Sequence, residues 1–362
     1  MNYLLMNKDK VVAEMSSKPV LDTVSFDIVK VLGELPYGFK SANEWLSGRQ
    51  AAKHRKHLER LMRECDCLSI VGYIRVLHCV SINDTFWVKC EDESIQWKNV
   101  SLFDNEFDET ITRIAFEGSG LYGERFTTTS PEFSIEGSYE KCCVKEDDGL
   151  YIIKRGTTGY ANAGLEPYSE VFSYPIYQRI VGIATPYELV HYHGKVASKC
   201  KLFTDDTLGF APYYKLSTET TDVATFNFYE KIGFVDLFRA MLVADAVCYN
   251  SDRHSGNHGV LYENDTMQML CMAPPFDHNL SLLPYAMESD FPTIDKYISE
   301  QGPRIGNDWV TVAKSVMSPT IRKRLINLKG YTIPFEGDEK FPKKRVDFLN
   351  DLINRQIDAI LR

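Results

Sequence analysis

The feature that most constrains this chain is a polar loop that directly follows its most apolar helical pattern. Residues 234–248 carry apolar side chains at i, i+3 and i+4 spacing, which predicts a buried helix. The next ten residues, 250–259, read Asn-Ser-Asp-Arg-His-Ser-Gly-Asn-His-Gly and supply Asp252 and Asn257, and Asp277 opens a later segment. One amide and two carboxylates can hold magnesium-bound phosphates while one of the carboxylates orients a hydroxyl for attack.

The order of these three groups is typical of protein kinases, in which a catalytic Asp, a metal-binding Asn and a later metal-binding Asp follow one another. Two other interpretations stay open. Asp-Arg-His in a loop can be turn chemistry, and His254 and His258 stand four residues apart, as in helical zinc sites. Gly256 and Gly259 argue against a regular helix here and therefore against zinc.

Composition limits the broad class of the protein. The 362 residues are 44% hydrophobic and 25% charged, which indicates folded domains rather than extended disorder. The net charge of −9 argues against direct binding of nucleic acid by the chain as a whole. The scattered cysteines form no CxxC motif, which indicates reduced thiols and a cytoplasmic location. The apolar part of the N-terminus is too short for a secretory signal, and no apolar run predicts a membrane span.

Changes in composition and hydrophobic pattern along the chain predict three parts: an accessory module at 1–120, a strand-rich part at 121–205 and a helical part at 206–362. In the first part, Asn43 can cap a helix that continues through the basic stretch 49–63. That stretch is either a solvated face or a docking site for an acidic partner or DNA. The β-branched residues of 70–80 indicate a strand, and a turn at 81–85 leads into another.

The second and third parts show a clear order of strands followed by helices. Residues 141–144 and 150–154 predict a hairpin closed by Asp147-Asp148-Gly149. The remaining predicted elements are a helix at 166–180, strands at 187–192 and 196–203, and amphipathic helices at 308–327 and 345–361. The sequence therefore predicts an α+β fold.

Two further segments carry groups suited to phosphate binding. Lys154 ends a predicted strand and Glu170 follows 16 residues later on a helix, which fits an ion pair that presents the ammonium to ATP phosphates. A solvated strand-end lysine is the alternative. Ser134 to Lys141 contains one glycine, Gly137, and matches the GxGxxG pattern poorly. It is either an ordinary turn or a loop that offers backbone N–H groups and Lys141 to phosphate.

Together these residues resemble the HipA-like serine/threonine kinases. The matching motifs are Asn250-x-Asp252-Arg253-His254-x-x-Asn257-x-Gly259 and Pro275-Phe276-Asp277-x-x-Leu280-Ser281-Leu282. Tyr-Ile-Ile-Lys at 151–154 and Glu166-Pro167-Tyr168-Ser169-Glu170 resemble the compact CtkA-like branch. The resemblance covers roughly residues 130–360. It implies a bilobal, phosphoinositide-kinase-like fold with a small β-rich N-lobe and a larger helical C-lobe, to which the N-terminal α/β module is added.

The resemblance also implies roles for individual residues and a set of partners. ATP and Mg²⁺ would be the cofactors, and a protein carrying Ser or Thr would be the substrate. In the toxin branch a loop serine is autophosphorylated and an antitoxin binds the kinase. The implied catalytic residue is Asp252, and the implied metal ligands are Asn257 and Asp277. Lys154, positioned by Glu170, would lie at the ATP phosphates together with Gly137, Ser138 and Lys141. Cys200, Leu202 and Phe203 would form a hinge at the adenine, and Ser134 or Ser138 would be the autophosphorylation site.

Two other functions remain open at this point. The chain can be a kinase-like interaction scaffold, a pseudokinase, that acts through residues 1–120. The same metal site can also serve a nucleotidyl transferase that adenylylates its target. A cytoplasmic toxin and a secreted effector without a classical signal both agree with the sequence.

Overall fold

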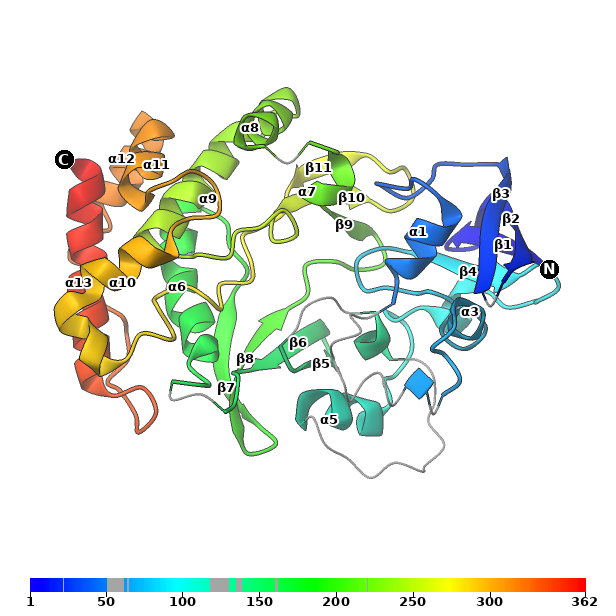
Figure 1. Cartoon of the computed structure of the whole chain (residues 1–362), viewed down its shortest axis with the longest axis horizontal. Helices are drawn as coiled ribbons and strands as arrows, with labels where there is room; N and C mark the ends of the chain where they lie inside the picture. The colour runs from blue at the N-terminus through cyan, green and yellow to red at the C-terminus, as the bar shows by residue number, and fades with distance from the viewer. Residues whose placement is uncertain are drawn as a thin grey trace. The chain divides into compact units, whose positions relative to one another are not determined.

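The computed structural model describes residues 1–21, 23–50, 62–63, 65–117, 130–134, 139–159, 162–219 and 221–362 of a mixed α/β chain (Figure 1). The chain forms two compact units. Unit 1 comprises Met1–Lys154, Lys201–Ala211 and Leu261–Leu270, and unit 2 comprises Arg155–Cys200, Pro212–Val260 and Cys271–Arg362. The three-part division at residues 120 and 205 stays a prediction.

Unit 1 begins with an antiparallel sheet in the order β3-β2-β1-β4. Its strands are β1 (Asn2–Asn7), β2 (Lys10–Val20), β3 (Thr23–Val31) and β4 (Phe86–Cys90). Because successive side chains of a strand point to opposite faces, Tyr3 and Leu5 pack into one apolar cluster, whereas Leu4 and Met6 pack into another. The sheet is therefore covered by apolar side chains on both faces.

The helix predicted to start at Asn43 and run through 49–63 is wrong in both its cap and its length. Helix α1 (Ala42–Ser47) is capped by Ser41 and ends at Gly48. The Asn43 side chain instead accepts from the Phe26 N–H at 2.8 Å and donates to its carbonyl at 3.1 Å. Arg49 is buried in an ion pair with Asp84 at 2.5 Å, so it does not belong to a solvated face. Residues 51–61 lie outside the described residues.

The strand predicted for residues 70–80 is also wrong. This segment forms helix α3 (Ile70–Leu77), whose Ser69 cap accepts from the Gly72 N–H at 3.0 Å. Tyr73, Ile74 and Leu77 share one helical face and are buried in the core of unit 1. Burial of that face outweighs the weak β preference of the branched side chains. The turn that leads into a strand is confirmed by β4.

The predicted hairpin is confirmed as β5 (Lys141–Glu146) and β6 (Gly149–Arg155). Gly149 adopts a φ of 143°, which only glycine tolerates readily, at the turn between them. Unit 1 also contains most of a small sheet in the order β11-β10-β9. The further elements are α4 (Trp97–Val100), α5 (Glu109–Glu117), η1 (Pro131–Phe133), β9 (Leu208–Pro212), β10 (Gly259–Glu263) and β11 (Met269–Met272).

Unit 2 is mainly helical and adds one hairpin, whose two strands are predicted at 187–192 and 196–203. Residues 308–327 form two helices rather than one, because Ser318 and Pro319 begin a new helix after a break. The elements of this unit are α6 (Glu166–Val181), β7 (Tyr187–Tyr192), β8 (Lys195–Lys201), α7 (Tyr213–Leu216), α8 (Asp222–Lys231), α9 (Val235–Cys248), η2 (Glu288–Thr293), α10 (Ile294–Gln301), α11 (Trp309–Ser315), α12 (Pro319–Ile326) and α13 (Lys343–Leu361).

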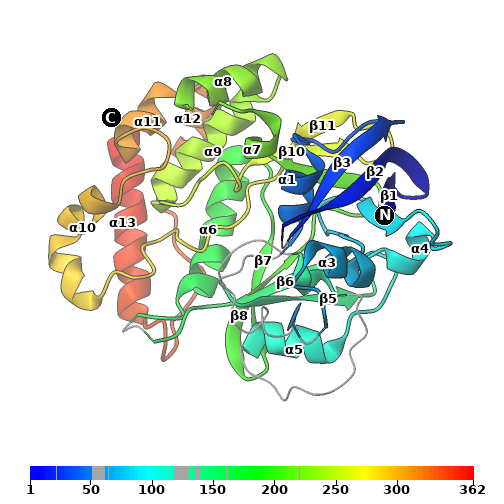
Figure 2. The same cartoon turned by 45° about the vertical axis from the view of Figure 1, so that its right-hand side comes forward.

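Helix α9 is the centre of unit 2. Its residues from Ala240 to Cys248 are all buried, and α6 and α13 pack beside it (Figures 1 and 2). A helix that is apolar all round is stable only inside a core, so α9 fixes the position of whatever follows its C-terminus. None of the helices in the described ranges is long and apolar enough to cross a membrane.

We expect the α13 face to contribute strongly to the stability of unit 2. Ile353 on α13 is fully buried, whereas Ile326 at the end of α12 is 48% exposed. Ile353→Ala should lower the free energy of unfolding by about 2–4 kcal/mol, because it removes buried methyl groups and leaves a cavity. Ile326→Ala is the control and should change it by no more than about 0.5 kcal/mol. Urea unfolding monitored by circular dichroism measures both; equal effects would contradict the core described here.

Candidate active site

The polar loop starts where α9 ends in a left-handed residue. Tyr249 has a φ of 53° and caps the helix by donating its N–H to the Asp245 carbonyl. The Asn250 side chain then donates to the Asp245 carboxylate at 3.1 Å, and its Oδ1 accepts from the Asp252 N–H at 3.1 Å. The helix end therefore fixes the backbone of Asp252.

Asn257 closes the same loop from its other end. Its Nδ2 donates to the Asp252 carbonyl at 2.9 Å, and its side chain is buried. This bond uses the amide nitrogen and leaves the amide oxygen as the atom suited to bind a cation. Asp252 and Asn257 are thus held as one constellation, as the sequence predicts.

Arg253 joins this loop to the segment that precedes Asp277. Its guanidinium is 2% exposed and donates through Nη1 to the carbonyls of Asn257 and Phe276, both at 2.8 Å. Its Nε and Nη2 donate to the Asp245 carboxylate at 3.0–3.2 Å. Burial acts to lower the pKa of Arg253, but Asp245 outweighs it and the pKa lies above its ordinary value. Arg253 therefore stays charged and holds two chain segments together.

Asp277 is fixed by its own backbone contacts. Its N–H donates to the Tyr187 hydroxyl at 3.0 Å, and its φ of 57° is one that Asp tolerates better than most residues. Further along, the Leu282 N–H donates to the Cys248 carbonyl at 2.7 Å and satisfies a group that the end of α9 leaves open. The segment that carries Asp277 is thus tied to the same helix end as Asp252.

Several neighbouring charges act on the Asp252 carboxylate. Burial raises the pKa of Asp252 above its ordinary value; His254 opposes this shift, Asp277 adds to it, and Arg304 opposes it. Asp277 and Asp252 are therefore near enough to repel each other. Two carboxylates and an amide oxygen are hard donors of the kind Mg²⁺ prefers, so the residues present fit that ion.

The two histidines have separate surroundings. The exposed His254 accepts from the Gly256 N–H through Nδ1 at 3.0 Å. His258 is buried, its Nδ1 lies 2.8 Å from the Tyr229 hydroxyl, and burial lowers its pKa to about 3. Within the described part of the chain, no three His, Cys, Asp or Glu side chains are grouped for a metal. The histidine-based zinc site therefore gains no support.

The residues predicted at the ATP phosphates belong to different units. Lys154 ends the unit 1 part of β6 and stands directly opposite Lys141 of β5, so both lysines lie on one face of the hairpin. Glu170 is buried on α6 in unit 2, where its carboxylate accepts from the Ser198 hydroxyl. The ion pair between Lys154 and Glu170 stays a prediction. Gly137 and Ser138 lie outside the described residues.

The segment predicted as a hinge contains a crossing between the units. Strand β8 ends at Lys201 rather than at residue 203, and Cys200 is the last residue of unit 2 before the chain enters unit 1. Leu202 donates its N–H to the Leu150 carbonyl at 2.8 Å, and the ring of Phe203 packs edge-on against Phe210. The contact with adenine stays a prediction.

Ser134, a predicted autophosphorylation site, is held inside unit 1. It is 9% exposed, and its hydroxyl donates to the Pro131 carbonyl at 3.1 Å. Phosphorylation there requires release of this segment, so the role of Ser134 stays a prediction.

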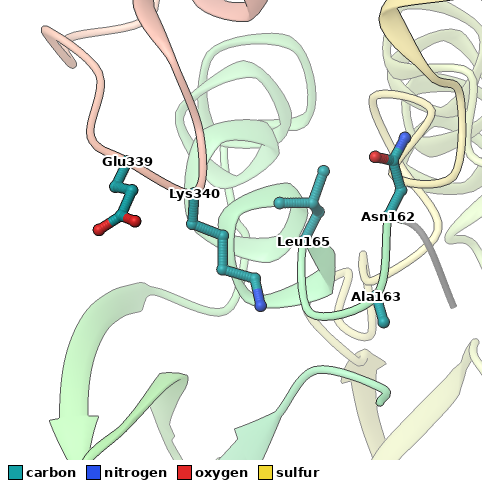
Figure 3. A pocket seen from close by; sticks show the side chains of 5 residues that line it. All are labelled: Asn162, Ala163, Leu165, Glu339 and Lys340. Carbon is teal, nitrogen blue, oxygen red and sulfur yellow. The ribbon is translucent and has the colours of Figure 1, made fainter. Parts of the chain in front are cut away.

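An open pocket of about 480 Å³ lies at the start of α6. Figure 3 shows Glu339 and Lys340 on one side and Asn162, Ala163 and Leu165 on the other. None of these lining residues belongs to the 250–259 loop or to the segment after Asp277. The pocket is therefore separate from the predicted catalytic residues.

Sequence reasoning missed the residues that hold the constellation together. These are Asp245 and Tyr177, together with the joining role of Arg253, which the motif names without a role. Tyr177 on α6 donates to the Asp245 carboxylate, and its ring stacks on His278 at 3.8 Å. One signal was present: Asp245 is a lone carboxylate within an apolar run, and such a residue needs a buried partner.

Comparisons with solved structures include two proteins whose folds are similar to that of this chain. No family model matches the sequence, and no curated protein does. The Helicobacter pylori proinflammatory kinase CtkA aligns at 18% identity over 63% of this chain and 92% of its own, with a TM-score of 0.47. HipA of Shewanella oneidensis MR-1, from a complex with HipB and operator DNA, aligns at 10% identity over 99% of both chains, with a TM-score of 0.48.

The Arg253–Asp245 pair should be essential for the fold of unit 2. Arg253→Leu should lower the free energy of unfolding by about 3–5 kcal/mol, because it leaves the Asp245 carboxylate buried without its cation. Adding Asp245→Asn should recover part of this loss. Urea unfolding of both single variants and the double variant measures the coupling.

Arg239 provides the matched control for this prediction. It pairs with the 81%-exposed Asp236 on the same helix at 3.2 Å. Arg239→Leu should change the free energy of unfolding by less than about 1 kcal/mol, because exposed ion pairs contribute little. A loss for Arg253→Leu as small as that of the control would contradict the joining role of Arg253.

Proposed function

We propose that this protein is an ATP- and Mg²⁺-dependent serine/threonine protein kinase of HipA-like type. The observation that carries the proposal is the Arg253 guanidinium, which holds the Asp252 loop and the Phe276 carbonyl next to Asp277. Two carboxylates and an amide oxygen thereby gather in the chain order that phosphoryl transfer uses. The motif resemblance supports the same reaction.

Each residue of the constellation then has a distinct task. The Asp252 carboxylate accepts the proton of the substrate hydroxyl, and its raised pKa makes it a stronger base than an exposed aspartate. Asn257 and Asp277 would hold Mg²⁺, which neutralises charge on the ATP phosphates when bound. The cross-strand lysines Lys141 and Lys154 would bind those phosphates through charge-assisted hydrogen bonds.

The proposal includes the partners that the resemblance implies. The substrate is a protein that carries Ser or Thr, and the kinase phosphorylates itself at a loop serine. A toxin role with an antitoxin partner extends the proposal; the HipA structure noted above contains HipB. The proposal includes a cytoplasmic location, with a secreted effector as the alternative.

Asp252→Asn should remove most of the transfer and leave nucleotide binding unchanged. The amide keeps the size of the side chain but cannot accept the proton, so the rate should fall by about a hundredfold to ten-thousandfold. Transfer from γ-labelled ATP with Mg²⁺, followed by intact mass, measures it. Asp236→Asn, an exposed change on α9, is the control and should keep full activity.

The same experiment separates kinase from rival functions. Phosphate adds about 80 Da and AMP about 329 Da to the target, so the second increment would indicate nucleotidyl transfer instead. Equal incorporation by wild type and Asp252→Asn would remove Asp252 from the mechanism. Nucleotide binding without any transfer to itself or to a cell extract would favour the interaction scaffold.

Changes at the metal and phosphate residues should have separable effects. Asn257→Ala and Asp277→Ala should weaken nucleotide binding in Mg²⁺ but not in EDTA, because their oxygens act through the metal. Lys154→Ala should weaken nucleotide binding in both buffers, because its ammonium meets phosphate directly. Titration with a fluorescent ATP analogue measures this. If Lys154→Ala matched wild type in both buffers, the lysine assignment would be wrong.

A further inference from the structure

A second chain segment places a cation beside Asp252. Arg304 lies in the 302–308 segment between α10 and α11, and its Nη2 is 3.8 Å from the Asp252 Oδ1. The Arg304 side chain is 62% exposed, whereas that of Asp252 is 23% exposed. This cation plays no part in the constellation described above.

The backbone of the 302–308 segment is held in place from both ends. Gly302 and Gly306 have φ values of 63° and 80°, which favour glycine and shape the turns on either side of Arg304. The Gly306 N–H donates to the Asp222 carboxylate at 2.9 Å, and Asp308 caps α11 by accepting from the Thr311 N–H at 2.8 Å. The position of Arg304 is therefore set by its segment and does not depend on its contact with Asp252.

The same segment also packs against the catalytic loop. Pro303 and Ile305, the two neighbours of Arg304, line a small cavity together with Asn250, Arg253 and Trp309. Asn250 and Arg253 are the residues that fix the backbone around Asp252. The 302–308 segment is thus packed against the loop that carries Asp252.

The contact of Arg304 with Asp252 leaves most of its hydrogen-bonding capacity unused. A guanidinium has five N–H donors, and the 3.8 Å approach is the one ion pair of Arg304 found in the described ranges. The two carboxylates that bind the backbone around this segment, those of Asp222 and Asp308, accept from the Gly306 and Thr311 N–H groups.

An exposed cation next to the position of the substrate hydroxyl attracts a carboxylate of the substrate more strongly than it attracts a neutral or basic side chain. On the basis of the proposed kinase activity, we propose that Arg304 selects protein segments in which an Asp or Glu lies within a few residues of the Ser or Thr that is phosphorylated. Arg304 forms a charge-assisted hydrogen bond with that carboxylate. A basic neighbour is disfavoured by like-charge repulsion.

Charge swapping between enzyme and peptide tests this assignment. The substrates are matched Ser-centred peptides that carry Glu, Gln or Lys at the flanking positions, and the enzymes are wild type, Arg304→Gln, Arg304→Glu and Arg239→Glu. Wild type and the distant Arg239→Glu should favour the Glu peptide over the Gln peptide by about tenfold in kcat/KM. Arg304→Gln should lose this preference, and Arg304→Glu should favour the Lys peptide.

Other results would overturn the proposal. If wild type treats the three peptides alike, or if Arg304→Gln slows all of them by the same factor, Arg304 only orients Asp252. Urea unfolding of each variant checks that the exposed change leaves the fold intact.

A binding measurement separates this proposal from the kinase proposal. The probe is a fluorescent, Ala-centred Glu peptide that cannot be phosphorylated, and its anisotropy is titrated with each enzyme. We expect about tenfold weaker binding to Arg304→Glu than to wild type. If no enzyme transfers phosphate but this difference is found, the kinase proposal fails and the acidic-peptide site stands. If binding to wild type and Arg304→Glu is equal, the acidic-peptide site fails, whatever the transfer assay shows.

Discussion

The candidate active site depends on the buried ion pair between Arg253 and Asp245. Burying either charge alone costs several kcal/mol, so the two side chains are stable inside unit 2 only together. Asp245 projects from the central helix α9, and Arg253 uses its remaining donors to hold the carbonyls of Asn257 and Phe276. The charge pair therefore links three chain segments.

Side-chain contacts of this kind hold the polar groups of the site in a region with little regular secondary structure. The loop after α9 contains no helix or strand of its own, and the end of α9, backbone hydrogen bonds within the loop and side chains together hold it. Asn250 and Asn257 bind the backbone of Asp252 from both ends, and Tyr187 binds that of Asp277. Such contacts fix the backbone from which each of the two carboxylates projects. The Arg304 side chain is exposed, whereas Asn250, Arg253 and Asn257 are buried.

Elements with a strong local pattern were predictable from sequence, and features set by distant contacts were not. The buried helix at 235–248, the hairpin at 141–155 and the helix at 166–181 have strong local signals, and the structure confirms them. The segment 70–77 was mistaken for a strand because β-branched residues are compatible with either structure. Its helix is stabilised by the Ser69 cap and by burial of one face against the core. Arg49 was misplaced for a related reason, because its partner Asp84 is distant in sequence.

The sequence by itself determined which groups are available for chemistry. Asp252, Asn257 and Asp277 follow an apolar helix in an order that suggests phosphoryl transfer, and this order is a local property of the chain. Only the tertiary structure decided how these groups are held and what surrounds them. The contacts of Arg253 with Phe276 and of Arg304 with Asp252 join residues 23 and about 50 positions apart. No local pattern encodes them, because the energy of a buried or paired charge depends on the whole environment that folding creates.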